Sequence, residues 1–86
     1  MIEVSYTPTF IKQLNSLEPE LQEESIEKIE LFKGEKNHKQ LKVHKLKGRL
    51  KNRLSFSVNY RTRIIFDYLS SKEVVLLAIG DHDVYK

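Results

Sequence analysis

The sequence predicts an α+β fold in which an N-terminal helical hairpin packs on one face of a small β-sheet. Apolar residues recur at helical spacing between residues 8 and 32, and they alternate with polar residues after residue 53. With 86 residues, the chain predicts a single domain over 1–86. A sheet this small cannot bury its apolar side alone, so the helices are expected to cover it.

The first elements are a strand and a short helix. Ile2, Val4 and Tyr6 alternate with polar residues, which is typical of a strand. Thr7 suits the N-cap of a helix and Pro8 suits its first position. The apolar residues that follow at helical spacing are Phe10, Leu14 and Leu17.

A second helix is expected to begin at Glu18-Pro19 and to end near Gly34. The link between the helices is too short for anything but a hairpin. Glu24 and Lys28 have the spacing of an ion pair within a helix. The expected buried stripe consists of Leu21, Ser25, Ile26, Ile29 and Phe32.

The remaining elements are strands, which gives the order β-α-α-β-β-β. Residues 41–46 are expected to form a short strand, residues 54–60 and 62–68 show period-two alternation, and 73–79 form the last strand. The sheet is expected to be antiparallel apart from strand 1. Its second face is expected to be partly open and to display Arg53, Ser55, Ser57, Arg61 and Arg63.

The charge is distributed unevenly along the chain. Between Lys33 and Arg63 lie 11 of the 15 Lys and Arg residues, against the single acid Glu35. Residues 18–30 reverse this balance, with six acids and one base. A solvated basic face is the plain interpretation, but strand alternation gathers these charges on one side, which favours a polyanionic partner.

Composition excludes several classes of protein. The chain has no cysteine, so disulfides and thiolate chemistry are excluded and a reducing cytoplasm is favoured. No signal peptide is expected, because strand-like sequence begins at Ile2. The longest apolar run, residues 74–79, is too short to span a bilayer, so no membrane partner is expected.

The last strand runs directly into Gly80-Asp81-His82-Asp83-Val84-Tyr85. A buried strand that becomes polar must surface at the rim of the sheet, and this brings an imidazole, two carboxylates and a phenol together. No metal site is expected from these residues, because consecutive strand residues point to opposite faces.

Four segments, taken in order, resemble the RelE/ParE toxin superfamily, and most closely the RelE-type mRNA interferases of type II toxin–antitoxin modules such as YafQ, YoeB and HigB. The segments are His44–Gly48, Leu54–Val58, Tyr60–Phe66 and Ile79–Tyr85. The resemblance implies a toxin that cleaves mRNA in the ribosomal A site, contacts rRNA and is neutralised by a cognate antitoxin. The toxin alone is expected to be monomeric and to form a hetero-oligomer with the antitoxin.

The resemblance also implies site residues. Arg63 matches the family's arginine in the Tyr-Arg-hydrophobic-hydrophobic-aromatic strand, and His82 matches the C-terminal catalytic histidine of the YoeB, HigB and YafQ-like members. Tyr85 lies where RelE and its relatives carry a C-terminal catalytic aromatic residue, and His44 resembles the first histidine of YafQ. Two departures make the site a hybrid. RelE carries lysines near Arg53, Ser55 and Ser57, and YafQ carries a second histidine and an aspartate near Ser57 and Arg61.

Metal-free RNA cleavage needs a base for the 2′-hydroxyl, an acid for the leaving 5′-oxygen and a cation for the phosphate. Arg63 is assigned to the phosphate, His82 to the acid, His44 to the base, and Tyr85 to stacking or to the phosphate. No cofactor is required. The expected RNA contacts are Lys45, Lys47, Lys51, Arg53 and Arg61.

Structural interpretations of these residues stay open. His82 also suits a surface residue paired with its flanking aspartates, and Arg63 suits a partner for Asp67 or Glu73. His44 is equally compatible with no role, and His38 is expected to be solvated. At the level of function, the alternatives are a ParE-like protein that inhibits DNA gyrase without catalysis, and a degenerate toxin retained as a repressor partner.

Overall fold

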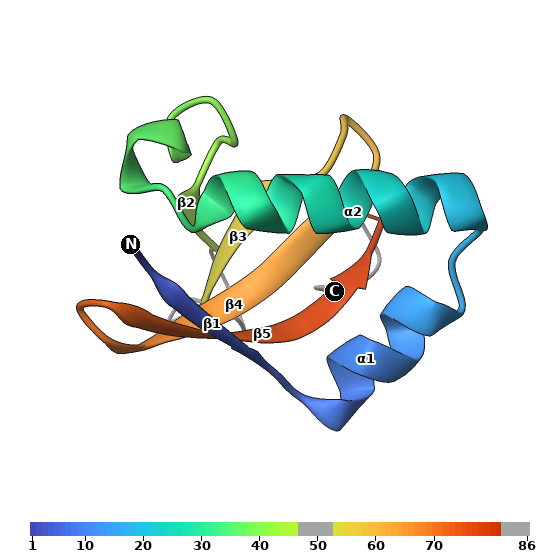
Figure 1. Cartoon of the computed structure of the whole chain (residues 1–86), viewed down its shortest axis with the longest axis horizontal. Coiled ribbons are helices and arrows are strands. Elements are labelled where there is room, and N and C mark those ends of the chain that lie inside the picture. Colours follow the sequence, from blue (N-terminus) through green and yellow to red (C-terminus); the bar gives the residue numbers. More distant parts are fainter. Residues whose placement is uncertain (47–52, 82–86) are drawn as a thin grey trace.

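The computed structural model describes residues 1–46 and 53–81, which form two helices on a five-stranded sheet (Figure 1). The helices are α1 (Pro8–Asn15) and α2 (Pro19–Phe32), and α2 is followed by a short 3-10 helix, η1 (Glu35–Asn37). The strands are β1 (Glu3–Tyr6), β2 (His44–Lys45), β3 (Leu54–Ser57), β4 (Arg63–Ser70) and β5 (Glu73–Gly80). The predicted α+β fold and the predicted order of its elements are confirmed.

The sheet is mixed, with the strand order β1-β5-β4-β3-β2. Strand β1 runs parallel to β5, with Val4 opposite Val74, whereas the other neighbouring strands are antiparallel. The predicted mixed character of the sheet is therefore confirmed. The parallel pair joins the two ends of the described chain, and the long crossover carries α1 and α2 over one face (Figure 1).

Helix α1 begins as its sequence predicts. The Thr7 hydroxyl accepts a hydrogen bond from the Phe10 amide at 3.0 Å and donates one to the Leu77 carbonyl at 3.1 Å. Pro8 occupies the first turn, where its missing N–H costs nothing. The same hydroxyl therefore caps α1 and ties it to β5.

Replacing Thr7 by alanine is expected to lower the free energy of unfolding by about 1–2 kcal/mol, because both hydrogen bonds are lost. Urea denaturation measures this change. Thr7→Ser keeps the hydroxyl and is expected to retain most of the stability. An alanine variant as stable as the wild type would contradict the capping role.

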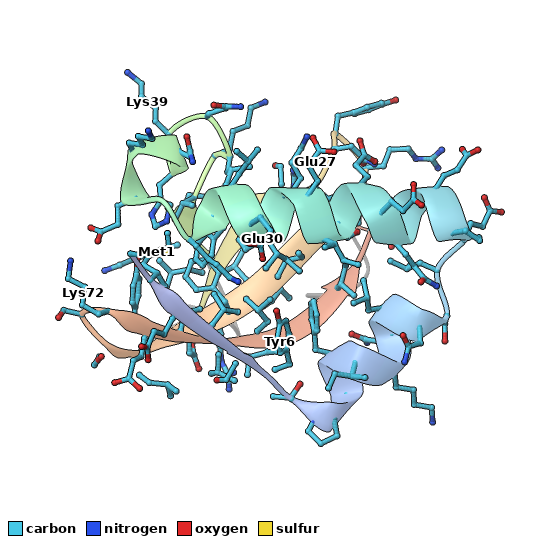
Figure 2. All side chains as sticks on the ribbon, viewed as in Figure 1. Met1, Tyr6, Glu27, Glu30, Lys39 and Lys72 are labelled. Atoms are coloured by element: carbon cyan, nitrogen blue, oxygen red, sulfur yellow. The ribbon has the colours of Figure 1, made fainter. Side chains whose placement is uncertain are left out.

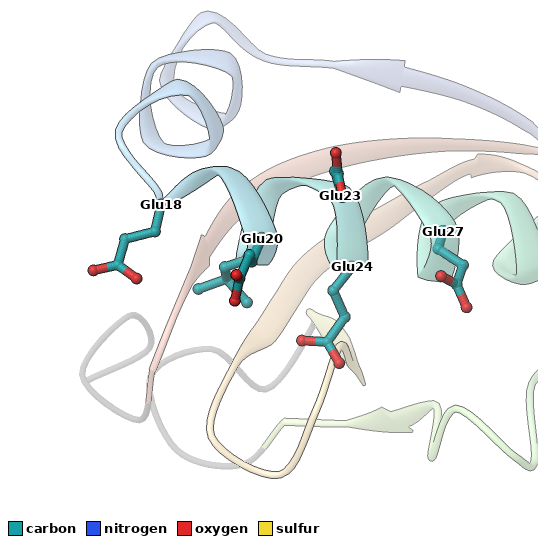
Figure 3. A pocket seen from close by; sticks show the side chains of 6 residues that line it. Glu18, Glu20, Glu23, Glu24 and Glu27 are labelled. Carbon is teal, nitrogen blue, oxygen red and sulfur yellow. The ribbon is translucent and has the colours of Figure 1, made fainter.

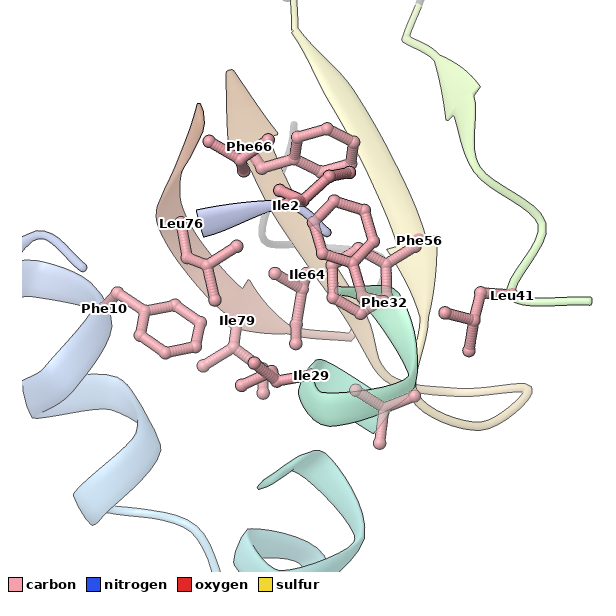
Figure 4. Packing of buried hydrophobic residues seen from close by; sticks show 12 residues of the cluster. Ile2, Phe10, Ile29, Phe32, Leu41, Phe56, Ile64, Phe66, Leu76 and Ile79 are labelled. Carbon is pink, nitrogen blue, oxygen red and sulfur yellow. The ribbon is translucent and has the colours of Figure 1, made fainter. Parts of the chain in front are cut away.

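The core is built around aromatic rings between α2 and the sheet (Figure 4). The ring of Phe32 stacks on that of Phe56, with centroids 4.3 Å apart and planes 8° apart, and meets Phe66 edge-on at 4.8 Å. The three rings are fully buried. The alternation in the sequence correctly predicts Phe56 and Phe66 as core residues.

The predicted stripe of α2 is wrong at one position. Ser25, Ile29 and Phe32 are buried, but Ile26 is 51% exposed. Successive helical residues are rotated by about 100°, so with Ser25 directed at the sheet its neighbour Ile26 lies on the flank. The Ser25 hydroxyl is satisfied by the Leu21 carbonyl at 2.7 Å, which is why a serine is tolerated there.

The strand predicted over 54–60 is shorter than expected. Strand β3 ends at Ser57, and the side-chain oxygen of Asn59 accepts hydrogen bonds from the amides of Arg61 and Thr62, which turns the chain. Tyr60 therefore lies in a turn. Similarly, the strand expected over 41–46 is limited to His44–Lys45, because Lys42 has a left-handed backbone with φ of 58°.

The second face of the sheet is less open than predicted. Ser55, expected to be displayed, is fully buried, and its register partner Ile65 is buried as well. Arg61 lies in the β3–β4 turn rather than on the sheet. Among the residues expected on this face, Arg53, Ser57 and Arg63 keep partial exposure.

His38 is not the solvated residue that was expected. Its ring stacks on Phe32 with centroids 4.6 Å apart, and its Nε2–H donates to the Phe32 carbonyl at 2.8 Å. It therefore satisfies a carbonyl at the end of α2 and extends the aromatic core.

Within residues 1–46 and 53–81, no helix has the length and apolar character that crossing a bilayer requires.

Candidate functional site

Arg63 begins β4 at one end of the sheet, where its register partners are Ser57 on β3 and Gly80 on β5. Residues opposite one another in a sheet share a face, so the Ser57 and Arg63 side chains meet. One guanidinium nitrogen, Nη1, donates a hydrogen bond to the Ser57 hydroxyl. This contact orients the half-buried guanidinium and uses one of its five N–H groups.

A groove of about 370 Å³ lies beside this pair. None of the described residues that line it is acidic, and its polar and aromatic lining includes Lys28, Gln40, Lys42, Ser57, Tyr60 and Arg63. Three cations around one concave surface attract an anion. Because an arginine can grip phosphate with two donors, Arg63 suits a phosphate group.

Acidic residues line a different hollow. Four glutamates of α2 and the preceding N-cap residue Glu18 surround it, and Figure 3 shows their side chains: Glu18, Glu20, Glu23, Glu24 and Glu27. The charge asymmetry of the sequence is therefore also an asymmetry of the folded surface. This distribution is expected to attract a polyanion to the groove of Arg63 and to repel it from the glutamates of α2, of which Glu27 is labelled in Figure 2.

His44 lies on the same sheet face as Ser57 and Arg63, because it pairs with Ser55 across β2 and β3. Its Nδ1 is 2.8 Å from the Lys42 carbonyl, which can only accept a hydrogen bond, so Nδ1 carries a hydrogen and Nε2 is the ring nitrogen left for another partner. His44 and Arg63 are two strands and two residues apart, about 12 Å between backbone positions from sheet spacings. Both side chains must therefore reach inward to meet one phosphate.

The other proposed RNA contacts lie in different surroundings. Lys45 is opposite Leu54 and so shares the helix-covered side of the sheet at its edge. Arg53 pairs with Asp67 at 3.1 Å. Arg61 is exposed and, with Asp81, lines a separate hollow of about 360 Å³. Four predicted site residues lie outside the described residues: Lys47, Lys51, His82 and Tyr85.

The end of β5 leads toward Arg63. Gly80, the last residue of the strand, is its register partner, and Asp81 follows. The last described residues, Gly80 and Asp81, therefore lie at the same end of the sheet as the arginine, whereas the predicted His82 lies outside the described residues. Among the residues that the structure describes, no group of three potential ligands is placed to hold a metal ion.

Four polar or aromatic residues of the groove were given no site role from the sequence: Lys28, Gln40, Asn59 and Tyr60. Lys28 was assigned to a pair with Glu24, but Glu24 instead accepts a hydrogen bond from Asn59 at 2.8 Å. The signal for Tyr60 was the preceding asparagine, a residue typical of turns. Gln40 carries no signal in the sequence.

Comparisons with known proteins show similarity at the level of the fold. No protein-family model matches the sequence, and no curated protein matches it significantly. Among solved structures, a conserved hypothetical protein of Helicobacter pylori has a TM-score of 0.73 at 23% identity over 100% of both chains. The RelBE2 toxin–antitoxin complex of Mycobacterium tuberculosis gives 0.69 at 19% identity, covering 94% of this chain and 98% of that one.

A third solved structure is the archaeal RelE–RelB complex of Pyrococcus horikoshii, with a TM-score of 0.71 at 18% identity over 93% of each chain. The three structural alignments each cover at least 93% of both chains. At TM-scores of about 0.7, the two helices and the mixed sheet of this chain, with β1 parallel to β5, match the fold of these structures. The chain therefore has the RelE-like fold.

Proposed function

We propose that this protein is the toxin of a type II toxin–antitoxin system and an endoribonuclease that cleaves mRNA in the ribosomal A site. The observation that carries the proposal is the groove beside Arg63, where Ser57 orients the guanidinium and Lys28 and Lys42 add positive charge. The RelE-like fold supports the toxin role, since two of the similar structures are toxin–antitoxin or RelE–RelB complexes. A cognate antitoxin is the expected protein partner.

In the proposed reaction, His44 removes the proton of the 2′-hydroxyl through Nε2, and the oxygen attacks the phosphorus. The bond to the 5′-oxygen breaks as His82 donates a proton to that oxygen, which leaves a 2′,3′-cyclic phosphate and a 5′-hydroxyl. Arg63 stabilises the negative charge that develops on the phosphate, and Tyr85 stacks on a base. The reaction requires neither a metal nor a cofactor.

Replacing His82 by alanine is expected to reduce cleavage about 10²- to 10⁴-fold, because the leaving oxygen loses its acid. The measurement is primer extension on mRNA from a reconstituted translation reaction, where the wild type should give codon-phased cuts only with ribosomes. An mRNA with a 2′-deoxynucleotide at the cut site should stay intact, since it lacks the nucleophile. Circular dichroism checks that the variant is folded.

Two outcomes would contradict the proposal. Intact mRNA together with inhibition of DNA gyrase would favour the ParE-like alternative. Intact mRNA with neither effect, but with antitoxin binding, would indicate a degenerate toxin. Wild-type cleavage by the His82→Ala variant would leave the nuclease in place but assign His82 to the surface.

A further inference from the structure

The turn between β3 and β4 presents an aromatic ring to solvent. Tyr60 is 85% exposed and lines the same groove as Lys28, Lys42 and Arg63. A ring left in water forgoes the stabilisation of burial, so packing against the residues that the structure describes does not account for it. A flat apolar face at the rim of a cationic groove is suited to a ligand that combines negative charge with aromatic rings.

The turn that carries Tyr60 is fixed on both sides. The amide group of Asn59 donates to the Glu24 carboxylate at 2.8 Å, although the two residues are 35 positions apart. Its oxygen accepts from the Arg61 amide at 2.9 Å and from the Thr62 amide at 2.8 Å. Figure 3 shows Glu24 directed from α2 toward this turn. Asn59 therefore uses its donor to hold the helix and its acceptor to shape the turn.

We propose that Tyr60 is a stacking platform for an unpaired RNA base adjoining the phosphate held by Arg63, and that the Glu24–Asn59 hydrogen bond holds the platform in place. Single-stranded RNA is bound through its backbone charges and by stacking of bases on aromatic rings. Holding the turn before binding reduces the entropy lost when the base stacks. The identity of the ligand rests on the proposed function, whereas the platform itself does not require cleavage.

The test measures binding without chemistry. A short fluorescent single-stranded RNA with 2′-O-methyl groups cannot be cleaved, and its affinity is read by anisotropy. Tyr60→Ala is expected to weaken binding about tenfold or more, while Tyr60→Phe keeps the ring and binds as the wild type does. The matched control is Tyr68→Ala, an exposed tyrosine five residues along β4 from Arg63, about 17 Å away, which should leave affinity unchanged.

Removing the base should cancel the effect of removing the ring. With an abasic residue at the stacking position, found by scanning along the oligonucleotide, the wild type and Tyr60→Ala should bind equally well. Equal penalties from Tyr60→Ala on intact and on every abasic RNA would overturn the platform, because ring and base would then act independently.

The Glu24–Asn59 hydrogen bond is tested with a separate pair of variants. Asn59→Asp keeps the oxygen that shapes the turn, but it loses the donor and sets two carboxylates against each other. This variant is expected to bind about as weakly as Tyr60→Ala. Adding Glu24→Gln supplies a donor from the helix side and is expected to restore affinity, with the same formal net charge as the wild type. If the double variant did not regain RNA affinity, the proposed role of the Glu24–Asn59 hydrogen bond would be contradicted.

The outcomes separate this inference from the proposed function. If mRNA is never cleaved but Tyr60→Ala and the abasic RNA change affinity as described, the nuclease proposal is contradicted and the stacking role of Tyr60 is supported. If cleavage occurs while Tyr60→Ala binds RNA as the wild type does, the platform fails and the nuclease stands. A wild-type protein that does not bind the RNA also overturns the platform.

Discussion

Replacement of Arg63 by alanine is expected to reduce mRNA cleavage about 100- to 1,000-fold, the loss that follows removal of one group that stabilises transition-state charge. The groove would lose the arginine that Ser57 orients, and the remaining cations, Lys28 and Lys42, are point charges without a planar fork. The folding cost is expected to be only about 1 kcal/mol, since one hydrogen bond to Ser57 is lost. The measurement is the single-turnover cleavage rate on saturating programmed ribosomes.

Matched variants divide this effect into its parts. Arg63→Lys keeps the charge but loses two-point contact with the phosphate, so an intermediate rate is expected. Ser57→Ala keeps the arginine but removes its hydrogen bond, so a smaller loss of about tenfold is expected from poorer positioning. Lys12→Ala, which removes an exposed cation from α1, controls for net charge and should cleave normally. An alanine variant at position 63 with the wild-type rate would assign Arg63 to structure alone.

The largest effect on stability is expected at Phe32. This ring is fully buried and contacts three others, those of His38, Phe56 and Phe66. Phe32→Ala should lower the free energy of unfolding by about 3–5 kcal/mol, through lost burial and the cavity left between α2 and the sheet. Since domains are stable by only about 5–15 kcal/mol, this variant should be close to unfolded at 37 °C.

Urea denaturation followed by circular dichroism measures the change. Phe32→Leu fills most of the volume and is expected to cost clearly less than the alanine variant. A loss below about 1 kcal/mol in Phe32→Ala would contradict a core centred on this ring. Because the groove is built from the end of β3, the β3–β4 turn and α2, loss of this packing should also weaken RNA binding.

Local patterns in the sequence were sufficient for the elements and the fold. The Thr7-Pro8 and Glu18-Pro19 pairs place the starts of both helices, because Thr7 caps α1 and a proline suits the first turn of each helix. Alternation along the strands correctly placed Phe56 and Phe66 in the core. The same alternation put Ser57 and Arg63 on one face, although it did not indicate that they touch.

Only the tertiary structure decided which of these residues meet. The register of β3 against β4 sets Ser57 opposite Arg63, and the angular position of α2 brings Glu24 to Asn59 and Lys28 to the groove. The tertiary structure also buries Ser55 and leaves Ile26 and Tyr60 exposed to solvent, whereas their positions in the sequence pattern predicted the opposite. Periodicity describes one element at a time, whereas contacts between elements depend on register, twist and packing summed over the whole core. For that reason the sequence determined the fold and the positive character of this protein, and the folded chain determined the groove, its oriented arginine and the turn that carries Tyr60.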